Sequence, residues 1–294
     1  MNNYFDILNQ MEFDPDRESK NLIDLLEMEK NFGHVYYTTI NSAISKNFLD
    51  YPNRSTFTSY SQIIEVISAN FYDATEELFV FSELLVDIFY SLLEKFTTEE
   101  CEFIQVIFDN INRFLELSNH ELITLDNGNR IIVEKNVYAS EVSQIVSETS
   151  IQDAIKVLEY NHFLNKGNIQ RKKEILLSLA GYLEPYLKKF DDPEKLPKEL
   201  KGIYNELKIV LQTKGADTDK KGNQIPKKIA VFDNLSEMYN KGGLRHNNDK
   251  QYHLDMNDEE LEQWYDNIYS STLFVILSLE MGKNLSKLNE LKKK

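Results

Sequence analysis

The sequence predicts a mainly α protein made of two helical domains with a single β-hairpin between them. The chain of 294 residues is long enough for two domains of ordinary size. Apolar residues recur at intervals of three and four over much of both halves, which is the spacing of one face of an α-helix. Between the halves, two β-prone runs flank the dipeptide Asn127-Gly128, which is a strong hairpin signal.

The region from Glu18 to Leu117 is expected to form about four or five helices. The segment Tyr51–Ser55 interrupts the helical spacing and is expected to be a loop. Thr97 is suited to cap a helix, because Glu99 and Glu100 follow it and acidic residues favour the positive end of the helix dipole. The apolar positions that define the helices are Ile23, Leu26, Ile63, Ile64, Ile67, the run Leu78–Leu93, Phe103, Val106, Ile107, Ile111, Phe114 and Leu115.

The hairpin is expected within residues 122–134. Its strands are Leu122–Leu125 and Arg130–Val133, and the Asn-Gly pair favours a tight turn in which both central residues have positive φ. Two strands alone are marginally stable, so the hairpin must pack on a helical neighbour. We place the domain boundary just after it, which gives an acidic helical domain at 1–140 and a helical bundle at 141–294.

The second half predicts further helices from residue 150 onward. Pro185 falls inside one of them and is expected to kink it or to mark its last turns. Residues 216–226 are polar and have no apolar period, so we expect a mobile loop. Asn257 is expected to cap the last helix, with Glu260 in the capping-box position. The apolar stripe of this helix is Leu261, Trp264, Tyr265, Ile268, Thr272, Val275, Ile276 and Leu279.

The apolar run Leu78–Leu93 is too short to span a bilayer and carries Glu83 and Asp87, so it predicts a buried helix and no membrane association. The N-terminus lacks the basic and apolar regions of a secretory signal, and we therefore expect a cytoplasmic protein. Cys101 stands among glutamates, without the electropositive neighbours that would make it a low-pKa nucleophile.

Charge is distributed unevenly along the chain. Residues 1–150 hold 9 Lys and Arg against 26 Asp and Glu, whereas residues 151–294 hold 24 against 22. The acidic first half repels nucleic acid, while lysine clusters in the second half could meet a phosphate backbone. The plainer interpretation, which covers most of these lysines, is that they solvate helix faces and loops.

The segment Asn240–Asp255, NKGGLRHNNDKQYHLD, places Arg245, His246 and His253 close together in sequence. Arginine presents a planar charged fork that suits phosphate, and histidine exchanges a proton near neutral pH. Such a pair suffices for RNA cleavage without metal: a base takes the proton of a ribose 2′-hydroxyl, and a cation stabilises the charge that develops on the phosphate. The need for the 2′-hydroxyl restricts this chemistry to RNA.

Two other interpretations of this segment remain open. After two glycines, Arg245 and His246 can simply cap the preceding helix, where cations bind the last carbonyls. A metal site made of His246, His253 and Asp255 is also conceivable, although the spacing matches no closed zinc pattern. The sequence contains no phosphate-binding loop, dinucleotide fingerprint, nucleophile elbow or HExxH motif, so no established enzyme motif competes. The single histidines His34, His120 and His162 are expected to be structural or surface residues.

Residues 235–280 resemble the end of AbiJ-like abortive infection proteins, in which a Gly-apolar-Arg-His segment follows a short helix and precedes an acid-capped final helix. Residues 129–159, NRIIVEKNVYASEVSQIVSETSIQDAIKVLE, and 171–187, RKKEILLSLAGYLEPYL, are similar to upstream elements of the same family. The resemblance implies a C-terminal HEPN-like helical bundle, a class that includes metal-independent, dimeric RNases. It also implies a phosphate-contacting Arg245, with His246 or His253 as the catalytic histidine. In the usual HEPN signature four to six residues separate Arg and His, whereas seven separate Arg245 from His253.

The expected function is therefore that of an antiphage effector, a HEPN-type endoribonuclease toxin that needs no cofactor or metal. Its expected partners are an RNA substrate, a second copy of the chain, and a phage-derived trigger or an antitoxin. Arg171, Lys172 and Lys250 are expected to contact the RNA. Two alternatives stay open: a non-catalytic HEPN-like module for dimerisation or for binding a nucleotide or protein, and a helical regulator with no antiphage role.

Overall fold

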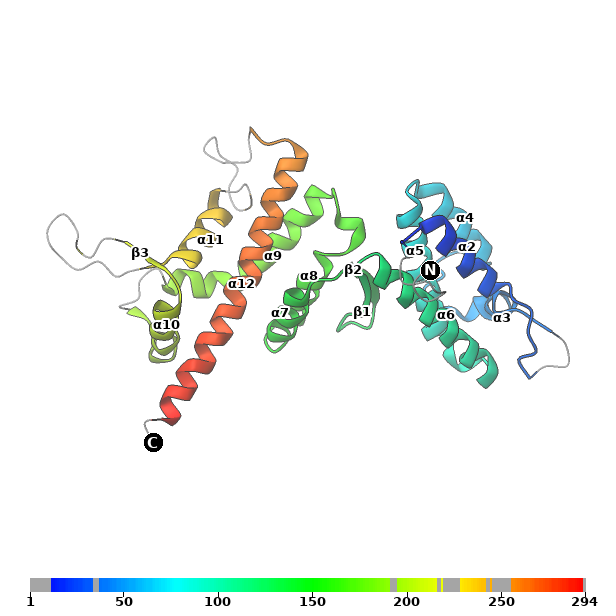
Figure 1. Ribbon diagram of the computed structural model, residues 1–294, viewed down its shortest axis with the longest axis horizontal. Coiled ribbons are helices and arrows are strands. Elements are labelled where there is room, and N and C mark those ends of the chain that lie inside the picture. Colours follow the sequence, from blue (N-terminus) through cyan, green and yellow to red (C-terminus); the bar gives the residue numbers. More distant parts are fainter. Residues whose placement is uncertain are drawn as a thin grey trace, which may run out of the picture. The chain divides into compact units, whose positions relative to one another are not determined.

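The computed structural model describes residues 12–33, 37–190, 195–215, 218, 228–241, 244 and 255–292. The chain divides into two compact units, Met1–Lys135 and Asn136–Lys294, which we call the N-terminal unit and the C-terminal unit. Helices dominate both units (Figure 1), which confirms the predicted mainly α fold. Among the helices of the described ranges, none has the length and apolarity needed to cross a membrane.

The helices of the N-terminal unit begin at side chains that bind their first amides. Thr97 Oγ1 accepts a hydrogen bond from the Glu100 amide at 3.2 Å, and the Glu100 carboxylate accepts one from the Thr97 amide at 2.8 Å. The predicted Thr97 cap is therefore confirmed. The described helices of this unit are α2 (Pro15–Leu26), α3 (Ile40–Asn47), α4 (Tyr60–Asn70), α5 (Ala74–Ser91) and α6 (Thr98–Leu117), with 3-10 turns η1 (Phe48–Asp50) and η2 (Leu93–Lys95).

The core of the N-terminal unit lies where α2, α5 and α6 contact one another. Most of the run Leu78–Leu93 forms helix α5 and buries a broad face, which confirms the predicted buried helix. A charged residue also lies in this core: Glu18 of α2 is 0% exposed. Its carboxylate pairs with Arg17 at 3.0 Å and with Arg113 of α6, so the buried charge is neutralised by two guanidinium groups.

The β-hairpin consists of β1 (His120–Thr124) and β2 (Arg130–Glu134), paired antiparallel with Leu122 opposite Ile132. It packs on α5, as expected from the marginal stability of two strands, and the Glu83 carboxylate accepts a hydrogen bond from the Ile132 amide at 2.6 Å.

The turn of the hairpin differs from the prediction. Only Gly128, at φ +88°, has a positive φ, whereas Asn127 does not. Backbone hydrogen bonds run from the Leu125 amide to the Asn129 carbonyl at 2.7 Å and from the Gly128 amide to the Leu125 carbonyl at 2.8 Å. The Asn127 side chain accepts a hydrogen bond from the Asn129 amide at 3.0 Å, which holds Asn127 outside the left-handed region. The loop therefore has three residues, 126–128, one more than the two-residue turn that was predicted.

The C-terminal unit is a bundle of helices. Pro185 lies inside its helix without ending it, because that helix continues to Phe190. The bounds of the described elements are α7 (Val137–Ser147), α8 (Ile151–Glu159), η3 (Phe163–Asn165), α9 (Ile169–Phe190), α10 (Lys198–Val210), β3 (Thr213–Lys214), β4 (Lys228–Ile229), α11 (Ala230–Lys241) and α12 (Asp258–Leu291).

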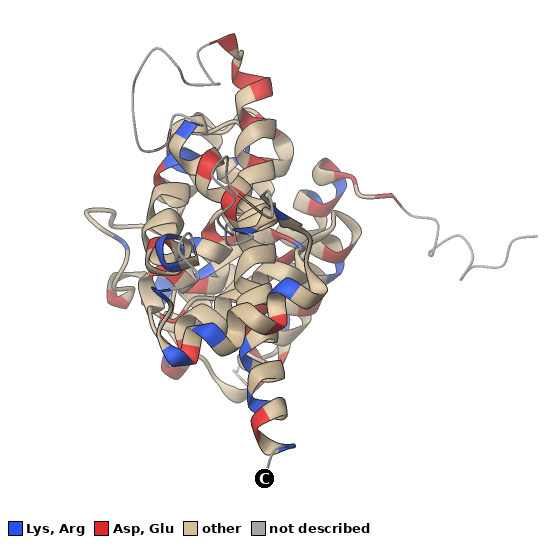
Figure 2. Cartoon of the chain, turned by 90° about the vertical axis from the view of Figure 1, so that its left-hand side faces the viewer, with Lys and Arg blue, Asp and Glu red and all other residues tan. Residues whose placement is uncertain are grey.

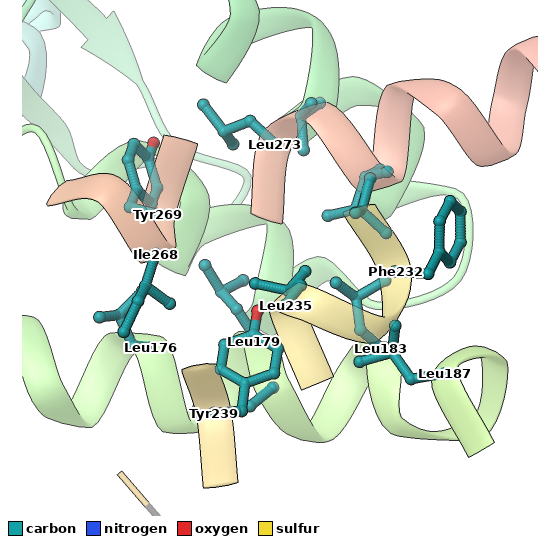
Figure 3. Close-up of a cluster of buried hydrophobic side chains, with 14 of the residues drawn as sticks. Leu176, Leu179, Leu183, Leu187, Phe232, Leu235, Tyr239, Ile268, Tyr269 and Leu273 are labelled. Atoms are coloured by element: carbon teal, nitrogen blue, oxygen red, sulfur yellow. The ribbon is translucent and has the colours of Figure 1, made fainter. Parts of the chain in front are cut away.

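The core of the C-terminal unit lies where α9, α11 and α12 meet (Figure 3). Tyr239 of α11 is 0% exposed, and its hydroxyl lies 2.5 Å from the Thr272 hydroxyl of α12, so the buried phenol is satisfied. The predicted capping box of α12 is confirmed, because the side chains of Asn257 and Glu260 each accept a hydrogen bond from the other residue's backbone amide at 3.0 Å. Figure 3 labels the central side chains of this core: Leu176, Leu179, Leu183, Leu187, Phe232, Leu235, Tyr239, Ile268, Tyr269 and Leu273.

A second short strand pairing joins β3 and β4, with Thr213 opposite Ile229. The predicted hairpin between the two domains is β1–β2, and the β3–β4 pairing is an additional feature inside the C-terminal unit. Strands of two residues carry no readable alternation, so no sequence pattern marks them. Most of the loop predicted at 216–226 lies outside the described residues.

The two units differ in net charge. The N-terminal unit holds 24 Asp and Glu against 9 Lys and Arg, whereas the C-terminal unit holds 24 of each. The whole net charge of −15 therefore belongs to the N-terminal unit. Figure 2 shows acidic and basic positions interspersed along the helices that face the viewer.

Candidate functional site

The predicted catalytic segment lies between α11 and α12. Arg245, His246, Lys250 and His253 are outside the described residues. What the structure gives is the framework on either side of the segment. Leu244, which directly precedes Arg245, is 5% exposed and belongs to the core cluster of the bundle.

Both ends of this framework are fixed to helix α12. On the N-terminal side, α11 is bound to α12 through the hydroxyls of Tyr239 and Thr272. On the C-terminal side, the Asn257 capping box sets where α12 begins. The helices on either side of the segment are therefore held by described contacts of the bundle, which is a rigid scaffold of the kind that carries functional loops.

Arg171, a predicted RNA contact, lies in the first turns of α9 and binds two carboxylates. Its Nε donates to Glu159 Oε1 at 2.8 Å, and its Nη1 lies 3.1 Å from Glu174 Oε2. Burial acts to raise the pKa of Glu159, but hydrogen bonds from Lys156 and Arg171 lower it below its ordinary value overall. The Arg171 side chain is 36% exposed, so its guanidinium reaches solvent while it is paired.

Lys172, the second predicted RNA contact, is 6% exposed. Its ammonium lies 2.7 Å from a carboxylate oxygen of Glu262 and 2.7 Å from one of Asp266, both on α12. Tyr160, which directly follows α8, donates to the same Asp266 oxygen at 2.8 Å, and the Gly167 amide donates to Glu262 at 2.7 Å. We call these four side chains, Tyr160, Lys172, Glu262 and Asp266, the Lys172 network.

The position of Lys172 gives no support to an RNA contact. Its ammonium is buried and already pairs with two partly exposed carboxylates, so a phosphate would have to displace two ion pairs to reach it. The physical reason is that Lys172 faces the apolar interface of α9, where a charged side chain is stable only when it is paired. We therefore assign Lys172 a structural role in joining α8, α9 and α12.

The Lys172 network is also unsuited to proton transfer near neutral pH. Burial, and then the Asp266 carboxylate, raises the pKa of Tyr160. Burial acts to raise the pKa of Glu262, but hydrogen bonds from Lys172 and the Gly167 amide lower it overall. Tyr160 therefore stays protonated and Glu262 stays ionised, so neither exchanges protons at the pH of a cell.

The described histidines stand apart from one another, as expected. His120 Nδ1 lies 2.7 Å from the Ser118 carbonyl oxygen, with its ring 4.8 Å from that of Phe79. The ring centroid of His162 lies 4.5 Å from that of Phe163, with the ring planes tilted by 36°. His34 lies outside the described residues. Burial, and then Glu100, raises the pKa of Cys101, which confirms the prediction that this thiol is not activated.

Sequence reasoning missed the Lys172 network. Its one readable signal is the spacing of Glu262 and Asp266, which places both carboxylates on the same face of a helix. No local sequence pattern connects that helix face to Lys172, because Lys172 and Asp266 are 94 residues apart in the chain. Within the described ranges, no group of three or more His, Cys, Asp or Glu side chains is arranged to hold a metal ion.

Comparison with known proteins finds no matching family model, no matching curated protein and no matching solved structure.

Proposed function

We propose that this protein is an abortive infection effector that cleaves RNA without a metal ion, at a site in its C-terminal unit. The proposal is supported by the order of the chain, in which the Arg-His segment follows α11 and precedes α12, two helices that pack in the core of the bundle. The resemblance of residues 235–280 to AbiJ-like proteins with a HEPN-like domain agrees with this place.

The chemistry requires two side chains. His246 or His253 takes the proton of a ribose 2′-hydroxyl, and the oxygen attacks the adjacent phosphorus. The bond from phosphorus to the 5′-oxygen breaks, and that oxygen leaves as a hydroxyl after it gains a proton. The products are a 2′,3′-cyclic phosphate and a 5′-hydroxyl end. Arg245 stabilises the negative charge that develops on the phosphate oxygens.

The basic residues around the site have different roles in this proposal. Lys250 contacts the RNA backbone, and Arg171 does so through the part of its guanidinium that reaches solvent. Two protomers bring their Arg-His segments together across a two-fold axis, as in other isologous dimers. The net charge of the N-terminal unit disfavours RNA elsewhere on the chain, so this unit acts as a sensor or a restraint.

A second candidate function is a non-catalytic module that forms dimers or binds a nucleotide or a protein. One observation favours it: Arg171 and Lys172, which belong to the predicted RNA-contact set, are both bound to carboxylates within the bundle. In this case Arg245 and His246 only cap and fasten the segment.

An Arg245→Ala variant separates the two candidates. We expect the wild-type chain to arrest growth when expressed and to degrade RNA in EDTA, and the variant to fold normally and do neither. The matched control is Lys201→Ala, which removes a positive charge from an exposed position of α10 and should behave as wild type. Equal RNA degradation by Arg245→Ala and wild type, or none by either, would refute the nuclease and favour the binding module.

A further inference from the structure

A cavity of about 390 Å³ lies in the N-terminal unit, between α2, α4 and α5. This volume lies within the range of small-molecule pockets. Its apolar lining includes Leu26, Ile67, Leu78 and Phe81, which are between 1% and 9% exposed. Ile23, also in the lining, is 50% exposed, so apolar surface continues to the mouth of the cavity.

Two buried polar atoms in the lining of this cavity are unsatisfied. Tyr60 is 3% exposed, and within the described part of the chain its hydroxyl has no hydrogen-bond partner. The side-chain oxygen of Asn41 is likewise buried without a partner among the described residues, while its nitrogen donates to Glu27. Buried polar groups in native proteins are nearly always paired, so two orphans in one cavity indicate a missing ligand.

The cavity is also negatively charged. Asp16, Glu27 and Glu77 belong to its lining, and no described lining residue is Lys or Arg. Asp16 and Glu27 are exposed, which places them toward the mouth. The Glu27 carboxylate is near enough to Tyr60 to act on it: burial, and then Glu27, raises the pKa of the Tyr60 hydroxyl. The phenol therefore stays neutral and can accept a hydrogen bond from a cation.

We propose that this cavity binds a small amphipathic amine. The ammonium group of the ligand pairs with Glu27 and donates to the orphan oxygens of Asn41 and Tyr60, and its apolar body lies against Ile67 and Phe81. Each part of the ligand follows from a feature of the lining. The Asn41 oxygen, which has no partner among the described residues, is an acceptor, and the charged side chains of the described lining are all negative. The site lies in the N-terminal unit and does not depend on the nuclease proposal.

Titration calorimetry of the full chain with three matched probes tests the ligand class. The probes are 4-phenylbutylamine, 4-phenylbutanol and 4-phenylbutanoate, which share an apolar body and differ in head-group charge. We expect the amine to bind about tenfold tighter than the alcohol, since hydrogen bonds to a charged group are the stronger ones. The carboxylate should not bind, because it meets negative charge. Equal affinity for the amine and the alcohol, or no binding of the amine, would overturn the proposal, and the latter would leave the cavity to water.

Three variants test the location of the site. Glu27→Gln and Tyr60→Phe should each weaken binding of the amine by about tenfold and leave binding of the alcohol much less changed. The matched control is Asp24→Asn, which removes the same charge from an exposed position of α2 outside the lining and should not change the affinity.

Thermal denaturation without ligand separates loss of binding from loss of folding. Tyr60→Phe removes an unpaired buried hydroxyl, so the variant should melt at or above the wild-type temperature while it loses affinity for the amine. If Asp24→Asn weakens binding as much as Glu27→Gln does, the amine binds only through the general charge of the unit, and the assigned site is wrong.

Discussion

Replacing Lys172 by methionine should destabilise the C-terminal unit, although methionine keeps an unbranched apolar side chain only one atom shorter. The substitution removes the ammonium that neutralises Glu262 and Asp266. Removing one partner of a fully buried ion pair costs about 3–5 kcal/mol. Glu262 and Asp266 are 22% and 49% exposed, so water solvates them partly once they are unpaired. We therefore expect a loss of about 2 kcal/mol, roughly half the value of a fully buried pair.

Differential scanning calorimetry at pH 7 should show the loss as a lower melting temperature of the C-terminal unit, by about 4–8 °C. The matched control is Lys173→Met on the neighbouring position of α9, which lies outside the Lys172 network and should change stability by less than about 0.5 kcal/mol. Equal stability of the two variants would refute the structural role of Lys172. If Lys172→Met were as stable as the control but failed to bind RNA, the RNA contact predicted from the sequence would be restored.

The pH dependence of the stability lost in Lys172→Met gives a second check. The network lowers the folded-state pKa of Glu262 below its ordinary value of 4.5, so its contribution to stability is present above about pH 4.5. As the pH falls through the folded-state pKa, Glu262 becomes protonated and the contribution is lost. The difference in melting temperature between wild type and Lys172→Met should therefore narrow below about pH 4.5.

Two further predictions concern the cores of the two units. Glu18→Gln should destabilise the N-terminal unit by about 2–4 kcal/mol at pH 7, because it leaves Arg113 and Arg17 without their buried carboxylate. Burial acts to raise the pKa of Glu18, but Arg113 and Arg17 lower it below its ordinary value overall. The stability lost in Glu18→Gln should therefore shrink as the pH falls below about 4.5. A loss of stability that stays constant with pH would contradict this role of Glu18. Gly282→Ala should cost about 1–3 kcal/mol in urea unfolding, since a Cβ there would lie 2.9 Å from Leu207 of α10; a neutral result would show that α10 and α12 separate easily.

Features that depend on neighbouring residues could be predicted from the sequence. The caps at Thr97 and Asn257 were correct because a cap and its partner lie within one turn of each other. The apolar stripe predicted for the last helix identified most of the buried face of α12 for the same reason. The hairpin was also identified, but its turn was not, because the side chain of Asn127 and the backbone of Leu125 decide between turns of similar sequence.

The candidate site shows the same limit. The sequence brings Arg245, His246 and His253 together because they are close along the chain, and their catalytic roles stay a prediction. Arg171 and Lys172 are adjacent in sequence and equally basic, yet Arg171 is partly exposed and Lys172 is buried. Which of the two side chains faces the bundle depends on the contact between α9 and α12, and this contact cannot be read from a local sequence pattern.

The sequence alone determined the helices, their caps, the existence of the hairpin and the concentration of negative charge in the first half. Only the tertiary structure decided that Glu18 is bound to Arg113 across 95 residues, and that the oxygens of Tyr60 and Asn41 lie beside one acidic cavity with no partner in the described part of the chain. The physical reason is the range of the interactions. Capping and helical spacing act within about one turn, whereas the pairing of a buried charge or the shape of a cavity depends on elements that meet only when the chain packs.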